Sequence, residues 1–340
     1  MKVLKWLLIV VVALLVGVIG AGFVLPDTAH VERSVVINAR PATVYTVLNG
    51  FRQFDKWSPW AGLDPNATYT VEGPLMGVGA KQSWRSDDPS VGAGSQEILE
   101  SVPNQKIVMA LVFEGFASEN RASYLLQPEG EATRLLWTYD STFHGNLLGR
   151  YFGLMMDGML GPDYERGLVA LKTLVESLPA TDISDLQISL ETVDSHPMLY
   201  ISGSAGPDEA RDVLGAIYGR IGAFMAERQL QQAAPPIAIT RAYDDETRAW
   251  QFDAALLPDR SEVDVPELSE IRLGQTYGGA VLTVLNTGPY TEMETLYTRL
   301  TAFREIAGLQ DNGDSWEQYL TDPSTTPPQQ AQTRVYWPVK

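Results

Sequence analysis

The residues whose types could do chemistry gather near the C-terminus, around Glu317. This carboxylate stands between Trp316 and Tyr319, shortly after Gly313, where we expect a helix to end. A carboxylate that aromatic rings remove from water is costly unless a cation or a hydrogen-bond donor meets it. Such a group selects apolar cations, and the rings add cation–π attraction. A surface glutamate on a loop or short helix is the simpler alternative.

Further aromatic residues could belong to the same site. Tyr290 follows Gly288-Pro289 at an expected strand-to-helix turn, and its hydroxyl could donate a proton while Glu317 activates a water. Others lie on or near neighbouring predicted strands, namely Tyr243, Trp250, Phe252 and Tyr277. Aromatic residues at alternating strand positions more often form core than ligand wall. Their number favours a cleft, and no single one of them identifies it.

The sequence lacks the residues and motifs that several other kinds of active site require. The histidines are His30, His144 and His196, none within four residues of another, and no H-E-x-x-H occurs, so we predict no metal site. Cysteine is absent, which excludes thiolate nucleophiles and disulfides. The motifs of serine hydrolases, nucleotide binders and dinucleotide binders are missing as well. We therefore predict no cofactor.

Length and charge limit the remaining choices. A chain of 340 residues has room for two domains of roughly 150 residues each. Apolar residues make up 45% and charged residues 20%, which is typical of folded rather than disordered chains. The formal charge is −17, and Lys and Arg form no clustered run. Because phosphates repel such a chain, we predict no nucleic acid partner.

An uncharged stretch of 20 residues, Trp6–Leu25, lies close to the N-terminus. As a helix it would measure about 30 Å, the thickness of the bilayer hydrocarbon core. Two basic residues precede it and two acidic residues follow it, namely Lys2, Lys5, Asp27 and Glu32. Positive charge stays on the cytoplasmic side. We therefore predict a single-pass inner-membrane protein with an anchor over residues 1–26, a cytoplasmic N-terminus and periplasmic soluble domains.

A cleaved signal peptide is the alternative interpretation of this stretch. Its apolar core usually has about 7–15 residues, fewer than are found here. The small residues Gly20 and Gly22 would nevertheless permit cleavage. We favour the uncleaved anchor.

The first soluble segment, residues 31–178, is predicted to mix strands and helices. Alternating, β-branched stretches bounded by turns predict short strands at Val31–Ala39, Lys81–Trp84, Ser95–Val102, Ile107–Phe113, Ala122–Gln127 and Thr133–Thr138. Pro41 begins a short helix over Ala42–Leu48. Apolar residues at helical spacing predict a long helix over Leu147–Ser177, broken once at Pro162.

The second segment, residues 186–340, contains an internal repeat. Each half has a strand, a Gly-Pro pair, a helix and a last strand that ends in proline. The corresponding pieces are Met198–Ala205 and Ala280–Thr287, then Asp208–Arg228 and Thr291–Ala307, then Trp250–Pro258 and Thr333–Pro338. Two β-α-β-β units related by a pseudo-twofold axis would leave room for a concave site between them. The fold class predicted for the whole chain is α+β.

Several sequence features of the first segment carry a family resemblance. They are VERSVVINARPATVYTVLNGFRQFDKWSPW from Val31, the turn Gly77–Gly79, the strand with Trp84, and YERGLVALKTLVES from Tyr164. In these features the segment resembles the SRPBCC superfamily, in its START-type branch similar to polyketide cyclases and dehydrases. The resemblance implies a helix-grip fold, in which a seven-stranded antiparallel sheet curls around the long C-terminal helix and encloses an apolar cavity. Members bind lipids, sterols, polyketides or other hydrophobic molecules.

Aromatic and thioether side chains are candidates for lining that cavity. They are Trp57, Trp60, Trp84, Trp137, Met155, Met156 and Met159. Flexible thioethers suit irregular apolar ligands. The simpler interpretation is that the same side chains form a packed core.

The second segment carries motifs of its own. They are Gly288-Pro289-Tyr290, Trp316-Glu317-Gln318-Tyr319-Leu320, Asp322-Pro323 and Val335-Tyr336-Trp337-Pro338-Val339. With them the segment resembles the GyrI-like domains, also known as the effector-binding domains of AraC-type regulators. The resemblance implies a duplicated fold that binds bulky, hydrophobic, often cationic drugs through a buried glutamate, whose position Glu317 matches. Some relatives hydrolyse electrophilic ligands instead. The helix-turn-helix of the regulators is missing here, so we do not expect transcriptional control.

Three functions are compatible with these patterns. The preferred one is a membrane-anchored, non-catalytic protein that binds hydrophobic and possibly cationic small molecules. The second is a hydrolase that detoxifies an electrophilic molecule, with Glu317 and Tyr290 as acid and base partners. The third is an interaction module that sequesters another protein. The sequence indicates neither the ligand nor the oligomeric state.

Overall fold

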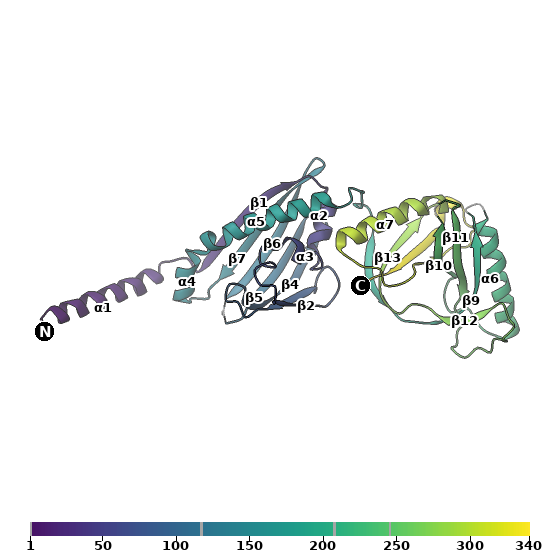
Figure 1. Ribbon diagram of the computed structural model, residues 1–340, viewed down its shortest axis with the longest axis horizontal. Coiled ribbons are helices and arrows are strands. Elements are labelled where there is room, and N and C mark those ends of the chain that lie inside the picture. The colour runs from purple at the N-terminus through teal and green to yellow at the C-terminus, as the bar shows by residue number, and fades with distance from the viewer. Residues whose placement is uncertain (1, 116–117, 207–208, 245) are drawn as a thin grey trace. The chain divides into compact units, whose positions relative to one another are not determined.

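The computed structural model describes residues 2–115, 118–206, 209–244 and 246–340 (Figure 1). The chain divides into two compact units, which are considered separately below. The first unit comprises Met1–Ser184 and Ala302–Gly308, and the second comprises Asp185–Thr301 and Leu309–Lys340. Pro207 and Asp208, which the sequence analysis places at a Gly-Pro turn and a helix start, lie outside the described residues.

The N-terminal helix α1 runs from Lys2 to Gly22. Its segment Leu4–Gly22 has 19 residues and a mean hydropathy of 2.6, and every residue in it except the last, Gly22, is exposed. By length and composition alone this helix could cross a membrane. It lies where the sequence predicts an anchor and ends three residues earlier than the uncharged stretch.

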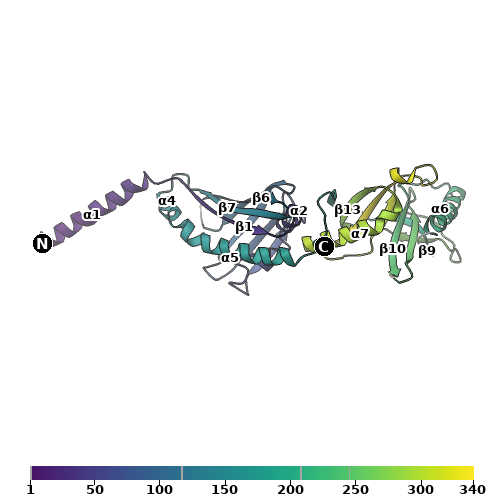
Figure 2. The same cartoon turned by 90° about the horizontal axis from the view of Figure 1, so that it is seen from above.

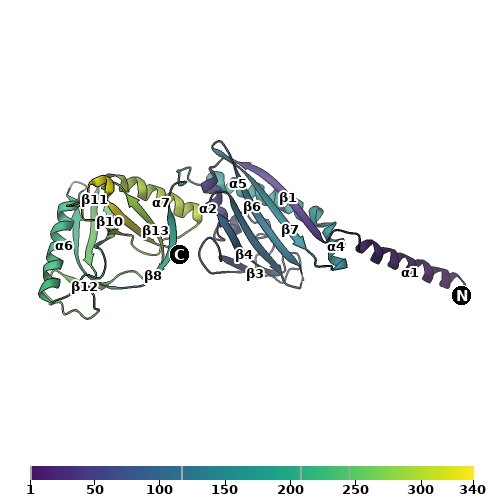
Figure 3. The same ribbon diagram turned by 180° about the vertical axis from the view of Figure 1, so that it is seen from behind.

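The first unit contains a seven-stranded antiparallel sheet in the order β1-β7-β6-β5-β4-β3-β2 (Figure 3). Its strands are β1 (Thr28–Ile37), β2 (Thr68–Glu72), β3 (Lys81–Arg85), β4 (Ala93–Val102), β5 (Lys106–Phe113), β6 (Glu119–Glu129) and β7 (Ala132–Thr142). Its helices are α2 (Pro41–Leu48), α3 (Phe54–Trp57), α4 (Leu147–Gly153) and α5 (Met156–Ser177). The long helix α5 crosses one face of the sheet (Figure 2). The helix-grip fold predicted from the resemblance is confirmed.

The helix α5 is held against the sheet by an apolar stripe. Tyr164, Leu168, Leu171 and Val175 are buried and follow one another at steps of four, three and four residues, as one face of a helix requires. Between them Gly167 brings the helix close to the sheet, because a Cβ at this position would lie 2.9 Å from the Trp137 ring. The helix therefore lies directly on the inward-facing aromatic residues.

The predicted helix break at Pro162 is wrong, because α5 continues through this residue. A proline inside a helix crowds the turn before it. Here that turn contains Gly158, which has open space around the position of a Cβ. The helical stretch is interrupted instead between α4 and α5. There Gly149 and Gly153 pack so closely on Phe143 that Cβ atoms would lie 2.9 and 2.8 Å from its ring.

The second unit contains an eight-stranded sheet in the order β12-β9-β11-β10-β14-β15-β13-β8. Its strands are β8 (Ile188–Val193), β9 (Pro197–Ala205), β10 (Ile237–Asp244), β11 (Ala249–Leu256), β12 (Arg272–Gln275), β13 (Gly279–Thr287), β14 (Trp316–Tyr319) and β15 (Gln332–Pro338). Its α-helices are α6 (Ala210–Glu227) and α7 (Met293–Ala307), of which residues 302–307 are counted in the first unit, and its 3₁₀ helices are η1 (Tyr290–Glu292) and η2 (Pro328–Gln330).

This strand order confirms the predicted duplication. The halves β9-α6-β10-β11 and β13-α7-β14-β15 meet where β10 pairs antiparallel with β14 in the middle of the sheet. Each half is preceded by a strand that pairs with the other half, since β8 joins β13 and β12 joins β9. The two halves are therefore joined both at the centre of the sheet and at its edges.

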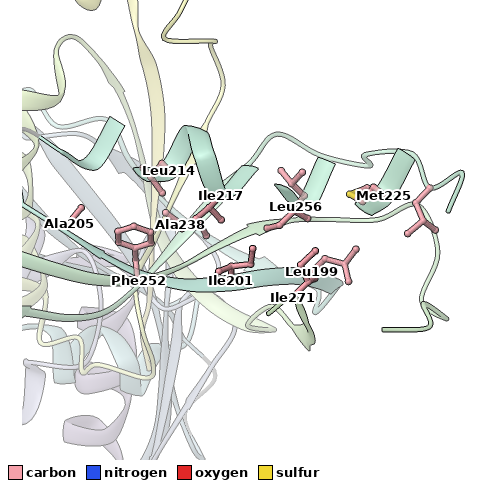
Figure 4. Close-up of a cluster of buried hydrophobic side chains, with 13 residues drawn as sticks. Leu199, Ile201, Ala205, Leu214, Ile217, Met225, Ala238, Phe252, Leu256 and Ile271 are labelled. Carbon is pink, nitrogen blue, oxygen red and sulfur yellow. The ribbon is translucent and has the colours of Figure 1, made fainter. Parts of the chain in front are cut away.

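The core of the first half lies between α6 and the sheet (Figure 4). From α6 it receives Leu214, Ile217, Ile221 and Met225, and from the strands it receives Leu199, Ile201, Ala238, Phe252, Ala254 and Leu256. The helical residues recur every three or four positions, and the strand residues every second position. Gly203 permits the close approach, because a Cβ there would lie 3.0 Å from both Ile217 and Phe252.

Candidate functional site

Glu317 lies on β14, the strand of the second half that pairs with β10 of the first half. In the pairing register Ala238 of β10 stands on one side of it and Val335 of β15 on the other. Only 8% of the residue is exposed. A small and an apolar neighbour thus leave the carboxylate without a partner in the adjacent strands.

Four tyrosines surround this carboxylate, and we call them the tyrosine cluster. Two of them donate hydrogen bonds to it. The Tyr319 hydroxyl lies 2.9 Å from Oε2, and the Tyr297 hydroxyl lies 3.3 Å from Oε1. The rings of Tyr218 and Tyr290 approach Tyr319 edge-on, with centroids 6.5 and 5.9 Å away. They come from α6, η1, α7 and β14, so the cluster joins both halves of the repeat.

Burial controls the electrostatics of this site. It raises the pKa of Glu317 above its ordinary value, and the hydrogen bonds from Tyr319 and Tyr297 only partly oppose that rise. Burial also raises the pKa of the Tyr297 and Tyr319 hydroxyls well above the usual range, and the nearby carboxylate adds to the effect. The hydroxyls therefore stay protonated and remain donors. An ionised Glu317 would gain from a cation that replaces the lost water.

Tyr290 is the most exposed member of the tyrosine cluster, at 37%. Tyr218 is turned inward, and its hydroxyl donates to the Ile237 carbonyl at 2.9 Å. Solvent therefore reaches the cluster at the Tyr290 side. Since Tyr290 follows the Gly288-Pro289 turn, the exposed edge of the tyrosine cluster lies next to this turn.

Trp316 lies on the opposite face of the sheet from Glu317, because successive strand residues alternate. It stacks on Tyr336 with centroids 4.8 Å apart, and Tyr277 lies beside it at 6.3 Å. Both rings belong to a separate buried cluster with Met198, Ile237, Ile239 and Val281. The structure thus places Trp316 and Tyr277 away from the carboxylate.

The remaining predicted aromatic residues of the second unit also lie outside the tyrosine cluster. Phe252 is 1% exposed and belongs to the core under α6. Trp250 packs against Phe252 and donates from Nε1 to the Thr240 hydroxyl at 3.1 Å. Tyr243 is 48% exposed near the end of β10. Sequence reasoning missed Tyr218 and Tyr297, although Tyr297 follows Tyr290 by two helical turns and could have been found by that spacing.

In the first unit, the predicted cavity residues Trp57, Trp60 and Trp137 share one aromatic cluster with Tyr124 and Tyr164. Trp137 stacks on Tyr164 at 3.8 Å, and Trp57 meets Trp137 edge-on at 5.5 Å. Trp60 donates from Nε1 to Asp163 of α5 at 3.2 Å. The buried Nε1 atoms of Trp57 and Trp137 both have no hydrogen-bond partner within the described part of the chain. They are donors in this interior that a ligand acceptor could satisfy.

The other predicted cavity residues of this unit lie elsewhere. Trp84 is half-buried near the far edge of the sheet, where it meets Phe113 edge-on and donates to the Val91 carbonyl at 3.3 Å. Met156 is buried, whereas Met155 and Met159 are 56% and 49% exposed. These two thioethers face outward rather than into the grip between helix and sheet. Among the described residues, no three His, Asp or Glu side chains gather as metal ligands.

Comparison with known families covers both units. Residues 28–176 match the family described as polyketide cyclase / dehydrase and lipid transport, and residues 186–340 match the family described as GyrI-like small molecule binding domain. The two matches follow the order predicted from the sequence. No curated protein is significantly similar to the chain.

Solved structures resemble parts of the chain at low identity. An uncharacterized conserved protein from Listeria innocua is 16% identical, with 49% of this chain and 96% of that chain covered and a TM-score of 0.37. A hydrolase from the same organism is 16% identical, with coverage of 45% and 91% and a TM-score of 0.35. Truncated norcoclaurine synthase from Thalictrum flavum is 13% identical, with coverage of 45% and 96% and a TM-score of 0.35.

Proposed function

Since the chain belongs to two families of small-molecule domains, polyketide cyclase / dehydrase and lipid transport over residues 28–176 and GyrI-like over residues 186–340, we propose that it binds hydrophobic cations at Glu317. The observation that carries the proposal is a carboxylate in the middle of a sheet, 8% exposed and surrounded by tyrosines from both halves of the repeat. A permanent cation that enters from the Tyr290 side would meet both a buried negative charge and aromatic faces.

Ligand-dependent stabilisation tests this proposal. We would measure thermal unfolding of the full chain in detergent with tetraphenylphosphonium, a lipophilic cation, and with triphenylphosphine oxide, a neutral compound of similar shape. At 100 times the dissociation constant a ligand adds about 2.7 kcal/mol to stability. We expect the cation, and not the neutral compound, to raise the unfolding temperature of the second unit.

The variant Glu317→Gln separates charge from shape, because its amide keeps the size of the side chain. We expect it to bind the cation at least about tenfold more weakly, a difference of about 1.4 kcal/mol. The matched control is Glu294→Gln, since this glutamate is 75% exposed on α7 and its loss changes the net charge by the same amount. Equal binding by wild type and Glu317→Gln would refute the proposed role.

Hydrolysis is a second candidate, favoured by one observation. A carboxyl with a raised pKa next to the Tyr319 hydroxyl, 2.9 Å away, can accept a proton from water and return it to a leaving group. An electrophilic substrate such as an epoxide would then be consumed at a rate that Glu317→Gln abolishes. If the cation binds and no electrophilic substrate is turned over, the hydrolysis candidate is refuted and only the binding function remains.

The proposed location follows from α1 and the charges beside it. We propose that α1 is an uncleaved anchor, with Lys2 and Lys5 on the cytoplasmic side and both soluble units outside the cell membrane. The two soluble units would then encounter ligands before these ligands enter the cytoplasm. Hydrophobic cations partition into membranes, so an anchored binder would encounter them at high local concentration.

A further inference from the structure

The short helix α4 and the two residues between α4 and α5 carry large apolar side chains that face outward. Leu148 is 81% exposed, Leu154 is 61% exposed and Met155 is 56% exposed. No residue of α4 is buried. We call Leu148, Leu154 and Met155 the α4 ridge. An exposed apolar group of this kind in a folded domain points to an interaction surface.

The helix α4 is attached to the end of α1 by its other residues. The Tyr151 hydroxyl donates to the Val18 carbonyl of α1. Arg150 donates to the carbonyls of Phe23 and Leu25 at 3.1 and 3.2 Å, just past the end of α1. Arg150 also donates to the carbonyl of Gly22 at 3.3 Å, one of the acceptors that the end of α1 leaves free. Figure 1 shows α4 beside this end of α1.

Two further contacts fix the same attachment. Arg150 Nε forms an ion pair with Asp27 at 3.1 Å. Gly22, the last residue of α1, has no side chain, and a Cβ there would lie 3.1 Å from the Tyr151 ring and 3.2 Å from Leu147. The helix α4 therefore packs directly on the last turn of the apolar helix.

The contacts also fix the depth of α4 if α1 spans a bilayer. The apolar segment ends at Gly22, and Val18 lies four residues earlier, which is about 6 Å along a helix axis. A helix that touches α1 between these two residues lies at the boundary between acyl chains and headgroups. Interfacial helices insert to about 5–10 Å at this boundary, and Tyr and Arg are common there.

We propose that the α4 ridge is inserted in the surface of the membrane that α1 crosses, so that the first unit is held against the lipid by two elements. This proposal rests on the anchor proposed above. The occupant of the ridge is lipid rather than a second protein, because α4, which carries Leu148, packs on the end of the apolar helix that we propose as the anchor. The acidic chain, at −17, gives no electrostatic attraction to anionic lipid, so the insertion is apolar.

The absence of cysteine from the sequence makes a depth measurement direct. We would place single cysteines at Leu148, Leu154, Val11 and Val169, label each with a fluorophore, and reconstitute the full chain in phosphatidylcholine vesicles. Bromine atoms on the acyl chains quench fluorophores that lie within the bilayer. Val11 lies within the apolar segment of α1, and Val169 is the matched control, since it is 63% exposed on α5 of the same unit.

We expect lipids brominated near the headgroup to quench the labels at Leu148 and Leu154, and to leave the label at Val169 unchanged. Added salt should not alter this result, because salt screens charges and not apolar contacts. Quenching at Val11 together with no quenching at Leu148 and Leu154 would overturn the ridge proposal and leave the anchor standing. No quenching at Val11 would overturn the anchor and the ridge proposal with it.

A second copy of the chain could cover the same ridge, and one further measurement distinguishes that outcome. Fluorophores at Leu148 would then quench one another as the ratio of protein to lipid rises, and brominated lipid would have no effect. That result would overturn lipid insertion. Quenching by brominated lipid that does not depend on the protein-to-lipid ratio would support it.

Discussion

Burial of Glu317 has a consequence for stability as well as for binding. Because burial raises the pKa of this carboxyl in the folded chain, its protonated form is favoured there. The stabilising contribution of the group is therefore fully present below the unfolded pKa, about 4.5, and is lost as the pH rises through the higher folded pKa. Wherever the pH ionises this side chain in the folded chain, its burial destabilises the fold, and a bound cation would relieve that cost.

The pH dependence of Glu317→Gln measures this cost. We expect the variant to unfold at a higher temperature than wild type at pH 7, and the difference to shrink as the pH falls towards 4. Thermal unfolding of the ligand-free full chain at several pH values provides the measurement. The exposed Glu294→Gln should stay within about 0.5 kcal/mol of wild type at each pH. A lower stability of Glu317→Gln at pH 7 would mean that the tyrosine hydrogen bonds outweigh the desolvation.

The sequence predicts part of this site and not the rest for a simple geometric reason. The pattern around Glu317 identifies the carboxylate and Tyr319, which lie on one face because they are two positions apart on a strand. The same pattern includes Trp316, which β14 turns to the opposite face. Trp316 can be separated from Glu317 and Tyr319 only if residues 316–319 are known to form a strand. A segment of four residues is too short for its hydrophobic pattern to show the period of a strand. Tyr218 is brought in by tertiary packing of α6, which local sequence does not encode.

At the scale of elements, α5 shows how glycine positions a helix. The sequence predicts this helix correctly from its apolar spacing, but it misplaces the break, because the cost of Pro162 depends on the space around the preceding turn. The two glycines Gly158 and Gly167 look alike in the sequence. In the structure Gly158 has open space around it, whereas Gly167 lies against the rings of Trp137 and Pro59. Their roles can be separated by substitution.

Alanine at these two positions should have opposite effects. Gly158→Ala should stabilise the first unit by up to about 1 kcal/mol, because alanine is the better helix former. Gly167→Ala gains the same propensity but places a Cβ 2.9 Å from Trp137 and 3.0 Å from Pro59, and overpacking costs about 1–3 kcal/mol. We expect a net loss of stability at Gly167, measured by thermal unfolding of the full chain. A gain of stability at both positions would contradict this prediction, and it would show that the aromatic side chains near Gly167 can move to accommodate the added methyl group.

At the scale of the whole molecule, the repeat was visible in the sequence but its connection was not. The Gly-Pro turns and the helices recur at matching offsets, which local patterns reveal. The exchange of β8 and β12 between the halves depends on pairing between residues about 70 or more positions apart, such as Ile188 with Val284 and Arg272 with Tyr200. β12 has only four residues, and its burial pattern shows no buried position. Such an edge strand leaves no hydrophobic signal for sequence reasoning to detect.

The orientation of the chain in a membrane is the last prediction, and it follows from the charges at the two ends of α1. With Lys2 and Lys5 held in the cytoplasm, cysteines introduced at Val169 of the first unit and Leu268 of the second should both react with a membrane-impermeant maleimide added outside intact spheroplasts. Both positions are exposed, at 63% and 101%. A cysteine at Leu4 should react only after the cells are lysed. Labelled chains shortened at the N-terminus and released into the medium would instead indicate a cleaved signal peptide, and labelling of Leu4 alone would reverse the proposed orientation.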